Sequence, residues 1–455
     1  MGEQEIPHHG HPMRTGLTAS GLALAMVAGV AAVEVFGRDG RDLDRFRSAQ
    51  DAHGSAAPNP HALPGVVVSG GNEIAEPSAT SKATTASATA SPTPKPTRTS
   101  SPSPSPSPTP KTSPSPEAQA TCIAKLPLAT RVAQTLFIGV YADNLQSSMP
   151  VFKKLQPGGA IIMTSPKDPA DGSIKRFKNA PKIPLLMGTD QEGGFVQRFF
   201  RDSHPIPAPA DVAAPGTGMT PAEAQAMMTR AGTRIHNADI DIDMAPLADV
   251  APKDGKSVLT TRVFSNDPAV VVEYDTAYIK GLRAAGIIPV IKHFPGMGGA
   301  SDNTDYHPAT TAPLSELKKR DLIPYKKLAY LDPVVMTGSP VVPGGSDGQP
   351  ANQSRKIVTD LLRGELGYED SFVITDSLSG VAIKDPVAAA INAVEVGNDM
   401  AMLTDPAPGM TMSQTITAVT TGLQQDVRSG KLSEAQLNAS VGRVMAAKRY
   451  VCPVS

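Results

Sequence analysis

The sequence contains no tryptophan, and aromatic residues make up only 4% of its 455 residues. We therefore expect no separate sugar-binding module built on a tryptophan platform. Its two cysteines, Cys122 and Cys452, are too few for a CxxC zinc site or a small disulfide-dense scaffold. With 42 Lys and Arg against 43 Asp and Glu, the chain has no excess positive charge that would favour a nucleic-acid partner.

Motifs for metals and cofactors are also missing. His293 and Asp249 suggest a pair of metal ligands, but no HExxH motif and no cluster of His and Asp at ligand spacing accompanies them. The Gly-rich stretch 296–299 does not open a helix with a GxGxxG pattern, as a dinucleotide site would. We expect neither a metal nor another cofactor.

An uncharged segment stands near the N-terminus. Between Arg14 and Glu34 lie 19 uncharged residues, enough for a helix to cross a bilayer. We expect residues 1–14 to form a cytoplasmic tail and residues 15–36 a transmembrane anchor or a cleaved signal segment. Both alternatives export the rest of the chain, which is then held at the outer face of the membrane or secreted to the cell wall or extracellular space.

Residues 37–120 lack helix or strand periodicity, and Ser78 to Pro116 is a Ser/Thr/Pro-rich repeat. Such sequence buries too little apolar surface to offset the entropy of ordering the chain. We expect a disordered linker of extended polyproline-II character, in which about forty residues reach on the order of 100 Å. This linker would hold the following domain away from a membrane and within a cell wall.

The two cysteines lie at the two ends of the remaining, globular part. Cysteines of exported proteins tend to pair, so we expect a Cys122–Cys452 disulfide that joins the ends of the domain. Closing so long a loop would stabilise the fold by roughly 2–5 kcal/mol. Two unpaired buried thiols are the alternative.

Residues 121–455 show a repeated alternation of short apolar runs and helical stretches. The runs are mostly continuous, as expected for parallel strands covered on both faces. Eight such β/α units predict a (β/α)₈ barrel of the TIM type, with a doubly wound sheet as the alternative. The predicted strands are Phe137–Ala142, Gly159–Thr164, Pro184–Asp190, Ile240–Asp249, Gly286–His293, Asp332–Gly338, Phe372–Ser377 and Gly397–Thr404.

Helix signals separate these runs. Thr220 to Glu223 reads as a capping box with proline at the first helical position. Residues 271–285 and 385–396 have helical patterns, and 355–367 ends on a glycine stop. Met227, Met228, Met400 and Met402 fall in helices or strands, where core packing is expected.

Polar side chains gather where the predicted strands end: Asp190, Asp249, Lys292, His293 and Asp376. In a barrel of parallel strands, the carboxyl ends of all strands meet at one mouth, which is where barrel enzymes carry their catalytic groups. The pattern favours a barrel with an active site at that mouth.

Three stretches carry a family resemblance: GTDQEGGFVQRF at 188–199, VIKHFPGMGGASDNTDYH at 290–307 and LLRGELGYEDSFVITDSLSG at 361–380. In this order they resemble glycoside hydrolase family 3, specifically its single-domain β-N-acetylglucosaminidases. The resemblance covers roughly Leu126 to Val451. It implies a single catalytic barrel, a retaining mechanism and a carbohydrate substrate.

The resemblance assigns the catalytic residues. Asp376 matches the nucleophile that forms a covalent glycosyl-enzyme. Asp305 and His307 match an Asp-x-His pair on a mobile loop, in which the histidine donates the proton and the aspartate fixes its tautomer. This loop is longer than is usual in the family, with six residues between Gly298 and Asp305, and Met297 replaces a histidine. Asp305 or Asp302 is the alternative donor.

The resemblance also assigns the sugar-binding residues. Asp190 matches a carboxylate that accepts hydrogen bonds from sugar hydroxyls, and Lys292 and His293 match a pair that donates to hydroxyls. Arg198 and Arg262 match substrate-binding arginines.

We therefore expect a monomeric exo-glycosidase that removes non-reducing terminal β-N-acetylglucosamine (GlcNAc) from cell-wall-derived glycosides, possible substrates being peptidoglycan fragments. A phosphorolytic relative and a β-glucosidase-like enzyme are alternatives. A catalytically silent cell-wall sugar-binding protein is a third, if the donor loop does not function.

Overall fold

The computed structural model describes residues 116–381 and 383–450. The expected tail, anchor or signal segment at 1–36, most of the expected linker and Cys452 lie outside the described residues, so these expectations and the disulfide stay predictions. Within the described ranges, no helix is both long and apolar enough to cross a membrane.

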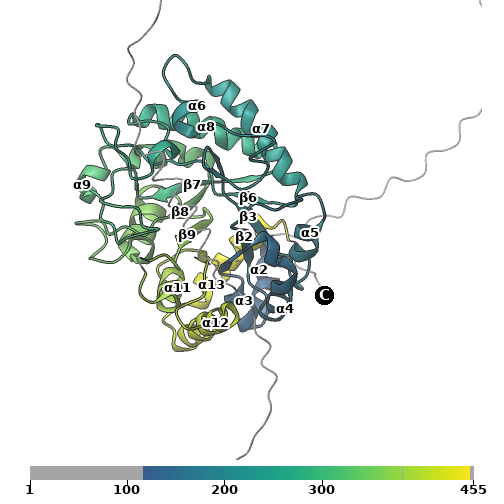
Figure 1. Cartoon of the computed structure of the whole chain (residues 1–455). Helices are drawn as coiled ribbons and strands as arrows, with labels where there is room; N and C mark the ends of the chain where they lie inside the picture. Colours follow the sequence, from purple (N-terminus) through teal and green to yellow (C-terminus); the bar gives the residue numbers. More distant parts are fainter. Residues whose placement is uncertain (1–115, 382, 451–455) are drawn as a thin grey trace, which may run out of the picture. The chain divides into compact units, whose positions relative to one another are not determined.

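Eight parallel strands close into a barrel in the order β1-β10-β9-β8-β7-β6-β3-β2 (Figure 1). Strand β1 pairs with both β2 and β10, so the sheet has no edge and the doubly wound alternative is wrong. The strands are β1 Leu136–Val140, β2 Gly159–Ile162, β3 Leu186–Thr189, β6 Ile242–Asp243, β7 Ile288–Phe294, β8 Val334–Thr337, β9 Val373–Ser377 and β10 Met400–Leu403.

Each of the eight predicted apolar runs overlaps one barrel strand, although β1 begins one residue before its run and β7 ends one residue after its run. The largest difference is at 240–249, where β6 has only two residues. Pro246 has no N–H to donate, and beyond it the pairing resumes only as an isolated bridge between Leu247 and Lys292. A small antiparallel hairpin, β4 Gln191–Gly193 with β5 Val196–Gln197, was not predicted.

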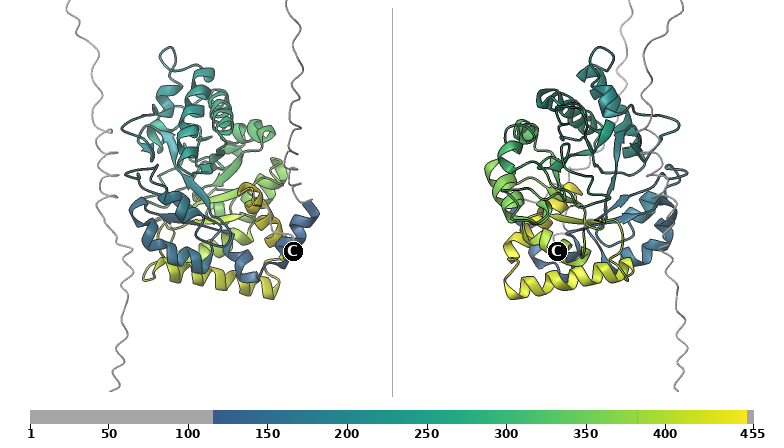
Figure 2. Two further views of the ribbon diagram at one scale, coloured as in Figure 1. Left: turned by 90° about the vertical axis from the view of Figure 1, so that its right-hand side faces the viewer. Right: turned by 60° about the vertical axis from the view of Figure 1, so that its left-hand side comes forward.

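Helices surround the barrel in every view (Figures 1 and 2). The α-helices are α2 Pro116–Lys125, α3 Leu128–Ala133, α4 Leu145–Leu155, α5 Ser173–Lys178, α6 Pro209–Val212, α7 Pro221–Asn237, α8 Pro268–Ala284, α9 Leu314–Leu317, α10 Leu322–Leu328, α11 Pro386–Glu395, α12 Met412–Ser429 and α13 Glu434–Ala447. Shorter turns are η1 Ala142–Asn144, η2 Thr260–Arg262, η3 Ala329–Leu331 and η4 Ala351–Gln353, and η5 Lys356–Glu365 is a π-helix.

Local sequence explains several of these boundaries. Thr220 caps α7 with the predicted capping box to Glu223, and Asp385 caps α11 through the backbone N–H of Ala388. Helix α2 begins at Pro116, so the predicted linker extends a few residues too far. The physical reason is an apolar contact, because Ile123 on α2 is buried.

The barrel interior is filled by apolar side chains from all eight strands, with Met400 and Met402 buried as predicted. Val444 of α13 joins this cluster, so α13 closes the end of the barrel at which the strands begin. The opposite end, where the strands finish, is left for polar side chains.

A buried ionic network stands at the closed end. The carboxylate of Asp399, immediately before β10, accepts hydrogen bonds from Arg363 at 2.9 Å and from Arg443 at 2.9 and 3.0 Å. It also accepts the backbone N–H of Val373 at 2.9 Å. Asp399 thereby links η5, α13 and the start of β9.

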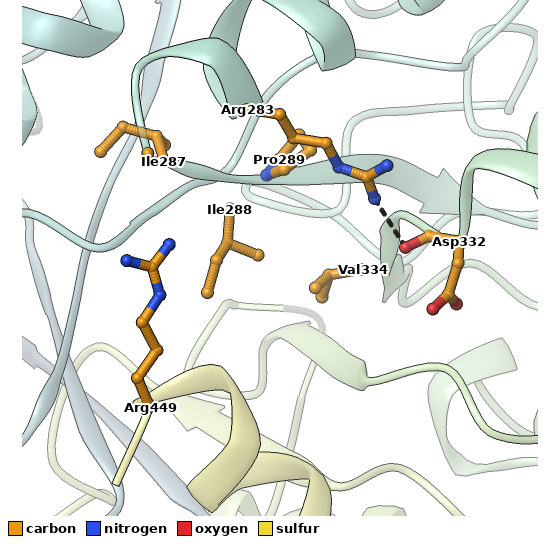
Figure 3. Close-up of a pocket in the computed structure, with 8 residues that line it drawn as sticks. Arg283, Ile287, Ile288, Pro289, Asp332, Val334 and Arg449 are labelled. Atoms are coloured by element: carbon orange, nitrogen blue, oxygen red, sulfur yellow. Dashed lines mark hydrogen bonds between the residues drawn. The ribbon is translucent and has the colours of Figure 1, made fainter. Parts of the chain in front are cut away.

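A cavity of about 200 Å³ opens at this same end, beside the first residues of β7 and β8 (Figure 3). Arg283 and Arg449 border it, and Arg283 donates to the backbone oxygen of Asp332 at 2.8 Å. Because the catalytic candidates stand at the carboxyl ends of the strands, this cavity does not belong to their site.

Candidate active site

The closed barrel brings the predicted site residues to one mouth. Asp190 directly follows β3, Lys292 and His293 stand near the end of β7, and Asp376 lies in β9. Asp249 comes from the segment after β6 and reaches His293. These residues are far apart in the chain, and only the barrel places them together.

Glu192 joins the predicted residues at their centre. One of its oxygens accepts hydrogen bonds from Arg262 and Lys292, at 2.9 and 2.5 Å, and the other accepts the Arg262 Nε–H at 2.8 Å. Lys292 also donates to Asp190 at 3.0 Å. In the sequence, Glu192 is one residue of the DQEGG motif, and no role was predicted for it. The signal available in the sequence was its position two residues after Asp190.

The charges in this cluster keep one another ionised. Burial by itself would raise the pKa of Glu192, but the positive charges of Arg262 and Lys292 outweigh it and hold that pKa at about 2. Burial by itself would lower the pKa of Lys292, but the carboxylates of Glu192 and Asp190 outweigh it and raise that pKa. Lys292 therefore remains a charged donor at neutral pH.

Asp243, the last residue of β6, was also missed. It is fully buried, and one oxygen accepts the backbone N–H of Gln191 at 2.8 Å, while the other has no hydrogen-bond partner among the described residues. Burial, reinforced by the charges of Asp190 and Glu192, raises the pKa of Asp243 to about 8. Asp243 is thus a neutral acid at pH 7 and adds no charge to the cluster.

Asp249 holds His293. Its Oδ2 accepts both the ring Nδ1–H of His293, at 2.7 Å, and the backbone N–H of His293, at 3.0 Å. Its Oδ1 accepts the backbone N–H of Met297 at 2.6 Å. With Nδ1 occupied, Nε2 is the ring nitrogen left to a ligand. In the described part of the chain, no three potential ligand side chains are grouped as a metal site requires.

Asp376 is partly exposed at the mouth. Burial raises its pKa and the negative charge of Asp305 adds to the effect, whereas the charges of His293 and Lys292 act in the opposite direction. The predicted nucleophile thus lies within the electrostatic reach of the predicted binding pair and of the loop aspartate. Its backbone is fixed by parallel pairing of β9 to β8 and β10.

The donor loop differs from the expectation. The structure pairs His307 with Asp302, at 3.2 Å between Nδ1 and Oδ2, and not with Asp305. The cause is a tight turn, since Asn303 accepts the backbone N–H of Asp305 on its side chain and that of His307 on its carbonyl. His307 points outward, with 68% of its side chain exposed. Asp305 is the loop residue whose charge acts on both Asp376 and Arg262.

Met297 anchors the base of this loop. It is buried, and its sulfur accepts a hydrogen bond from the Thr304 hydroxyl at 3.3 Å. The carbonyl of Thr304 in turn lies close to Gly380, after β9, where an added Cβ would be 3.3 Å away. The residue that replaces the family histidine therefore ties the loop down beside the strand that carries Asp376.

Arg198 follows the β4–β5 hairpin. Its backbone N–H donates to the carbonyl of Asp190 at 3.2 Å, which places it at the same rim. The structure thus brings the predicted binding residues to the mouth that holds Asp376: Asp190, Arg262, Lys292 and His293 through their side-chain contacts, and Arg198 through its backbone. Their roles stay predictions.

The neutral state of Asp243 predicts a pH-dependent stability. Between about pH 4 and pH 8 the unfolded chain has lost the Asp243 proton while the folded chain retains it, because the folded pKa is raised. The free energy of unfolding should therefore fall with rising pH in the wild type, relative to Asp243→Asn, by at most about 1.4 kcal/mol per pH unit. Urea unfolding of both proteins at pH 5 and pH 8 measures this. A difference that does not change with pH would contradict the assignment.

Comparison with known proteins supports the same reading. Residues 159–447 match the model of the glycosyl hydrolase family 3 N-terminal domain. The chain is 33% identical over 331 residues to β-hexosaminidase LpqI of Mycobacterium tuberculosis, an alignment that covers 70% of this chain and 82% of the relative. It is also 34% identical over 280 residues to a β-hexosaminidase of Alkalilimnicola ehrlichii, covering 59% and 80%.

Solved structures are similar in fold. The structure of M. tuberculosis LpqI has a TM-score of 0.65 at 31% identity, and covers 74% of this chain and 97% of its own. A family 3 glycosyl hydrolase from Mycobacterium smegmatis has a TM-score of 0.64 at 32% identity, with coverage of 71% and 98%. The matched barrel, the motif order and these likenesses agree, and the chain belongs to glycoside hydrolase family 3.

Proposed function

We propose that this protein is a retaining β-N-acetylhexosaminidase that removes terminal β-linked GlcNAc from the non-reducing end of glycosides. The observation that carries the proposal is Asp376, partly exposed at the barrel mouth within reach of the charges of Lys292, His293 and Asp305. The names of the relatives, β-hexosaminidases, supply the sugar class.

The binding side of the site has suitable chemistry for a pyranose. Asp190 would accept hydrogen bonds from sugar hydroxyls while Lys292 and Arg262 donate to others. Lys292 has three N–H bonds, of which two are engaged by Glu192 and Asp190, so one remains for a hydroxyl. His293, held through Nδ1, would offer Nε2.

Cleavage would proceed in two steps. The Asp376 carboxylate attacks the anomeric carbon, the bond to the aglycone oxygen breaks, and a proton from the donor loop goes to that oxygen. Water then loses a proton to the same loop group and attacks the anomeric carbon, which releases Asp376 and the sugar. Because Asp376 must be ionised and its pKa is raised, the rate should fall on the acid side at a higher pH than for an ordinary aspartate.

We assign the donor role to His307, which requires the loop to turn inward from the outward position it has in the structure. A donor loop that moves during the reaction is compatible with the few contacts that His307 makes. The outward position is also the observation that favours the second candidate, a silent sugar-binding protein.

The N-terminal sequence supports a proposal for the location of the protein and its natural substrate. An anchor or signal at 15–36 and a linker at 37–120 would place the barrel outside the membrane, and fragments of the cell wall are the GlcNAc glycosides found there. We propose that the domain acts as a monomer, either tethered or secreted.

Replacing the nucleophile tests the activity. Asp376→Asn should lower the release of p-nitrophenol from its β-GlcNAc glycoside by at least about 1,000-fold, because the amide cannot form the glycosyl-enzyme. Asp370→Asn is the matched control, since Asp370 is exposed just before the same strand. Equal rates for the Asp376 variant and the wild type would reject the proposal.

Leaving-group dependence identifies the donor. His307→Gln should lower the rate on an alkyl β-GlcNAc glycoside far more than on the 2,4-dinitrophenyl glycoside, whose leaving group needs no proton. Asp302→Asn and Asp305→Asn, assayed in parallel, show which carboxylate supports the histidine. If only Asp305→Asn shows this dependence, Asp305 is the donor and His307 is not.

The acceptor should be water. When the acceptor enters, Asp376 is esterified to the sugar, but the Asp305 carboxylate stands close enough to act on Asp376 and would repel a phosphate acceptor. Incubation of the enzyme and a β-GlcNAc reporter with inorganic phosphate should yield free GlcNAc and no sugar 1-phosphate by mass spectrometry. Accumulation of the 1-phosphate would show a phosphorylase instead.

A further inference from the structure

Glu192 is a buried carboxylate that contacts two of the candidate sugar-binding side chains. It is fully buried, so solvent does not reach it. Its two oxygens are occupied by two cations that come from different parts of the barrel, Lys292 on β7 and Arg262 on η2. Both cations are sugar-binding candidates, and Glu192 is the one carboxylate among the described residues that pairs with both.

The hairpin that carries Glu192 is itself held rigidly. The Gln191 side chain exchanges two hydrogen bonds with the backbone of Phe199, at 2.9 and 3.0 Å. Gly193 has a φ of 112°, and a Cβ there would lie 2.4 Å from the carbonyl oxygen of Pro207. The backbone on both sides of Glu192 is therefore fixed, and its carboxylate can define where the two cations stand.

Each cation depends on this carboxylate differently. Lys292 also donates to one oxygen of Asp190, at 3.0 Å, and the other Asp190 oxygen is then available to a sugar hydroxyl. Among the described residues, Glu192 is the carboxylate that Arg262 contacts, and it aligns two of the guanidinium nitrogens in a bidentate pair. Removing Glu192 would leave a buried lysine with less compensation and a buried arginine without a fixed orientation.

We propose that Glu192 is a positioning residue, which holds Lys292 charged and Arg262 oriented so that both meet the sugar as ready-placed donors. The inference rests on the proposed function for the identity of the sugar. It adds a residue that acts through two others and does not touch the substrate itself.

The Glu192→Gln variant distinguishes the positioning role of Glu192 from a purely structural one, because only the positioning role affects KM and the pH profile. Glu192→Gln retains the size of the side chain, but it removes the charge and replaces one of the two acceptor oxygens by an NH2 donor. The pKa of Lys292 should then fall, since Glu192 is the largest influence that raises it against burial. The alkaline limb of kcat/KM should move to lower pH by about one unit or more, and KM should rise with kcat less affected.

Asp399→Asn provides a matched control. Asp399 is likewise a buried carboxylate that bridges two cations, Arg363 and Arg443, but at the closed end of the barrel. Its variant should lose thermal stability and retain the pH profile and KM of the wild type. Glu192→Asp, which keeps the charge on a shorter side chain, should recover the alkaline limb while KM remains raised.

Measurement of GlcNAc binding by calorimetry tests the positioning role of Glu192 separately from the proposed hydrolase function. If the wild type binds GlcNAc but cleaves no β-GlcNAc reporter, the proposed function fails, and weaker binding by Glu192→Gln still supports the positioning role. A folded Glu192→Gln protein with wild-type binding, KM and pH profile overturns that role. If Glu192→Gln does not fold, a wild-type KM in Glu192→Asp overturns it equally.

Discussion

The mouth of this barrel depends on the pairing of buried charges. A lysine or an arginine withdrawn from water is tolerated only beside a carboxylate that compensates the lost hydration. Lys292 and Arg262 meet this condition through Glu192, and Lys292 also through Asp190. The ionic cluster that results is close to neutral, because Asp243 keeps its proton. Substrate hydroxyls would therefore meet charged donors and acceptors in a cluster whose positive and negative charges compensate each other.

The two ends of the barrel use similar interactions for different purposes. At the closed end, Asp399 binds two arginines and a backbone N–H beneath α13, and every partner is a structural element. At the open end, Glu192 pairs with Arg262 and Lys292, two candidate sugar-binding residues. The difference is that Lys292 at the open end belongs to the candidate sugar site and keeps one N–H beyond its bonds to Glu192 and Asp190. Stability and recognition are thus divided between the two ends of the same strands.

The donor loop is the part of the site that the fold leaves least constrained. Its base is anchored by Met297 and Thr304, but its tip carries His307 in an exposed pair with Asp302. The relatives named β-hexosaminidases are about one third identical to this chain, which supports the family and the sugar class. The conformation of this loop is known only from the structure of this chain. A catalytic group on such a loop is positioned by closure over the substrate, not by the barrel.

Much of the fold is determined by patterns that act locally. Continuous apolar runs separated by capped helices predict all eight barrel strands, and strand ends followed by polar residues predict the mouth that contains Asp190, Lys292 and Asp376. These elements can be predicted from the sequence because the spacing of apolar side chains and the capping of helices depend on residues only a few positions apart.

The pairing of side chains was decided only by the tertiary structure. Glu192 reaches Arg262 across 70 residues of sequence and Lys292 across 100, so no local pattern could reveal that one carboxylate serves both. The partner of His307 was misassigned for the opposite reason: the spacing Asp-x-His pointed to Asp305, whereas the turn around Asn303 brings Asp302 to the ring. Sequence alone determined which groups are present and on which strand they stand. Closure of the barrel and the path of one loop determined which of them meet.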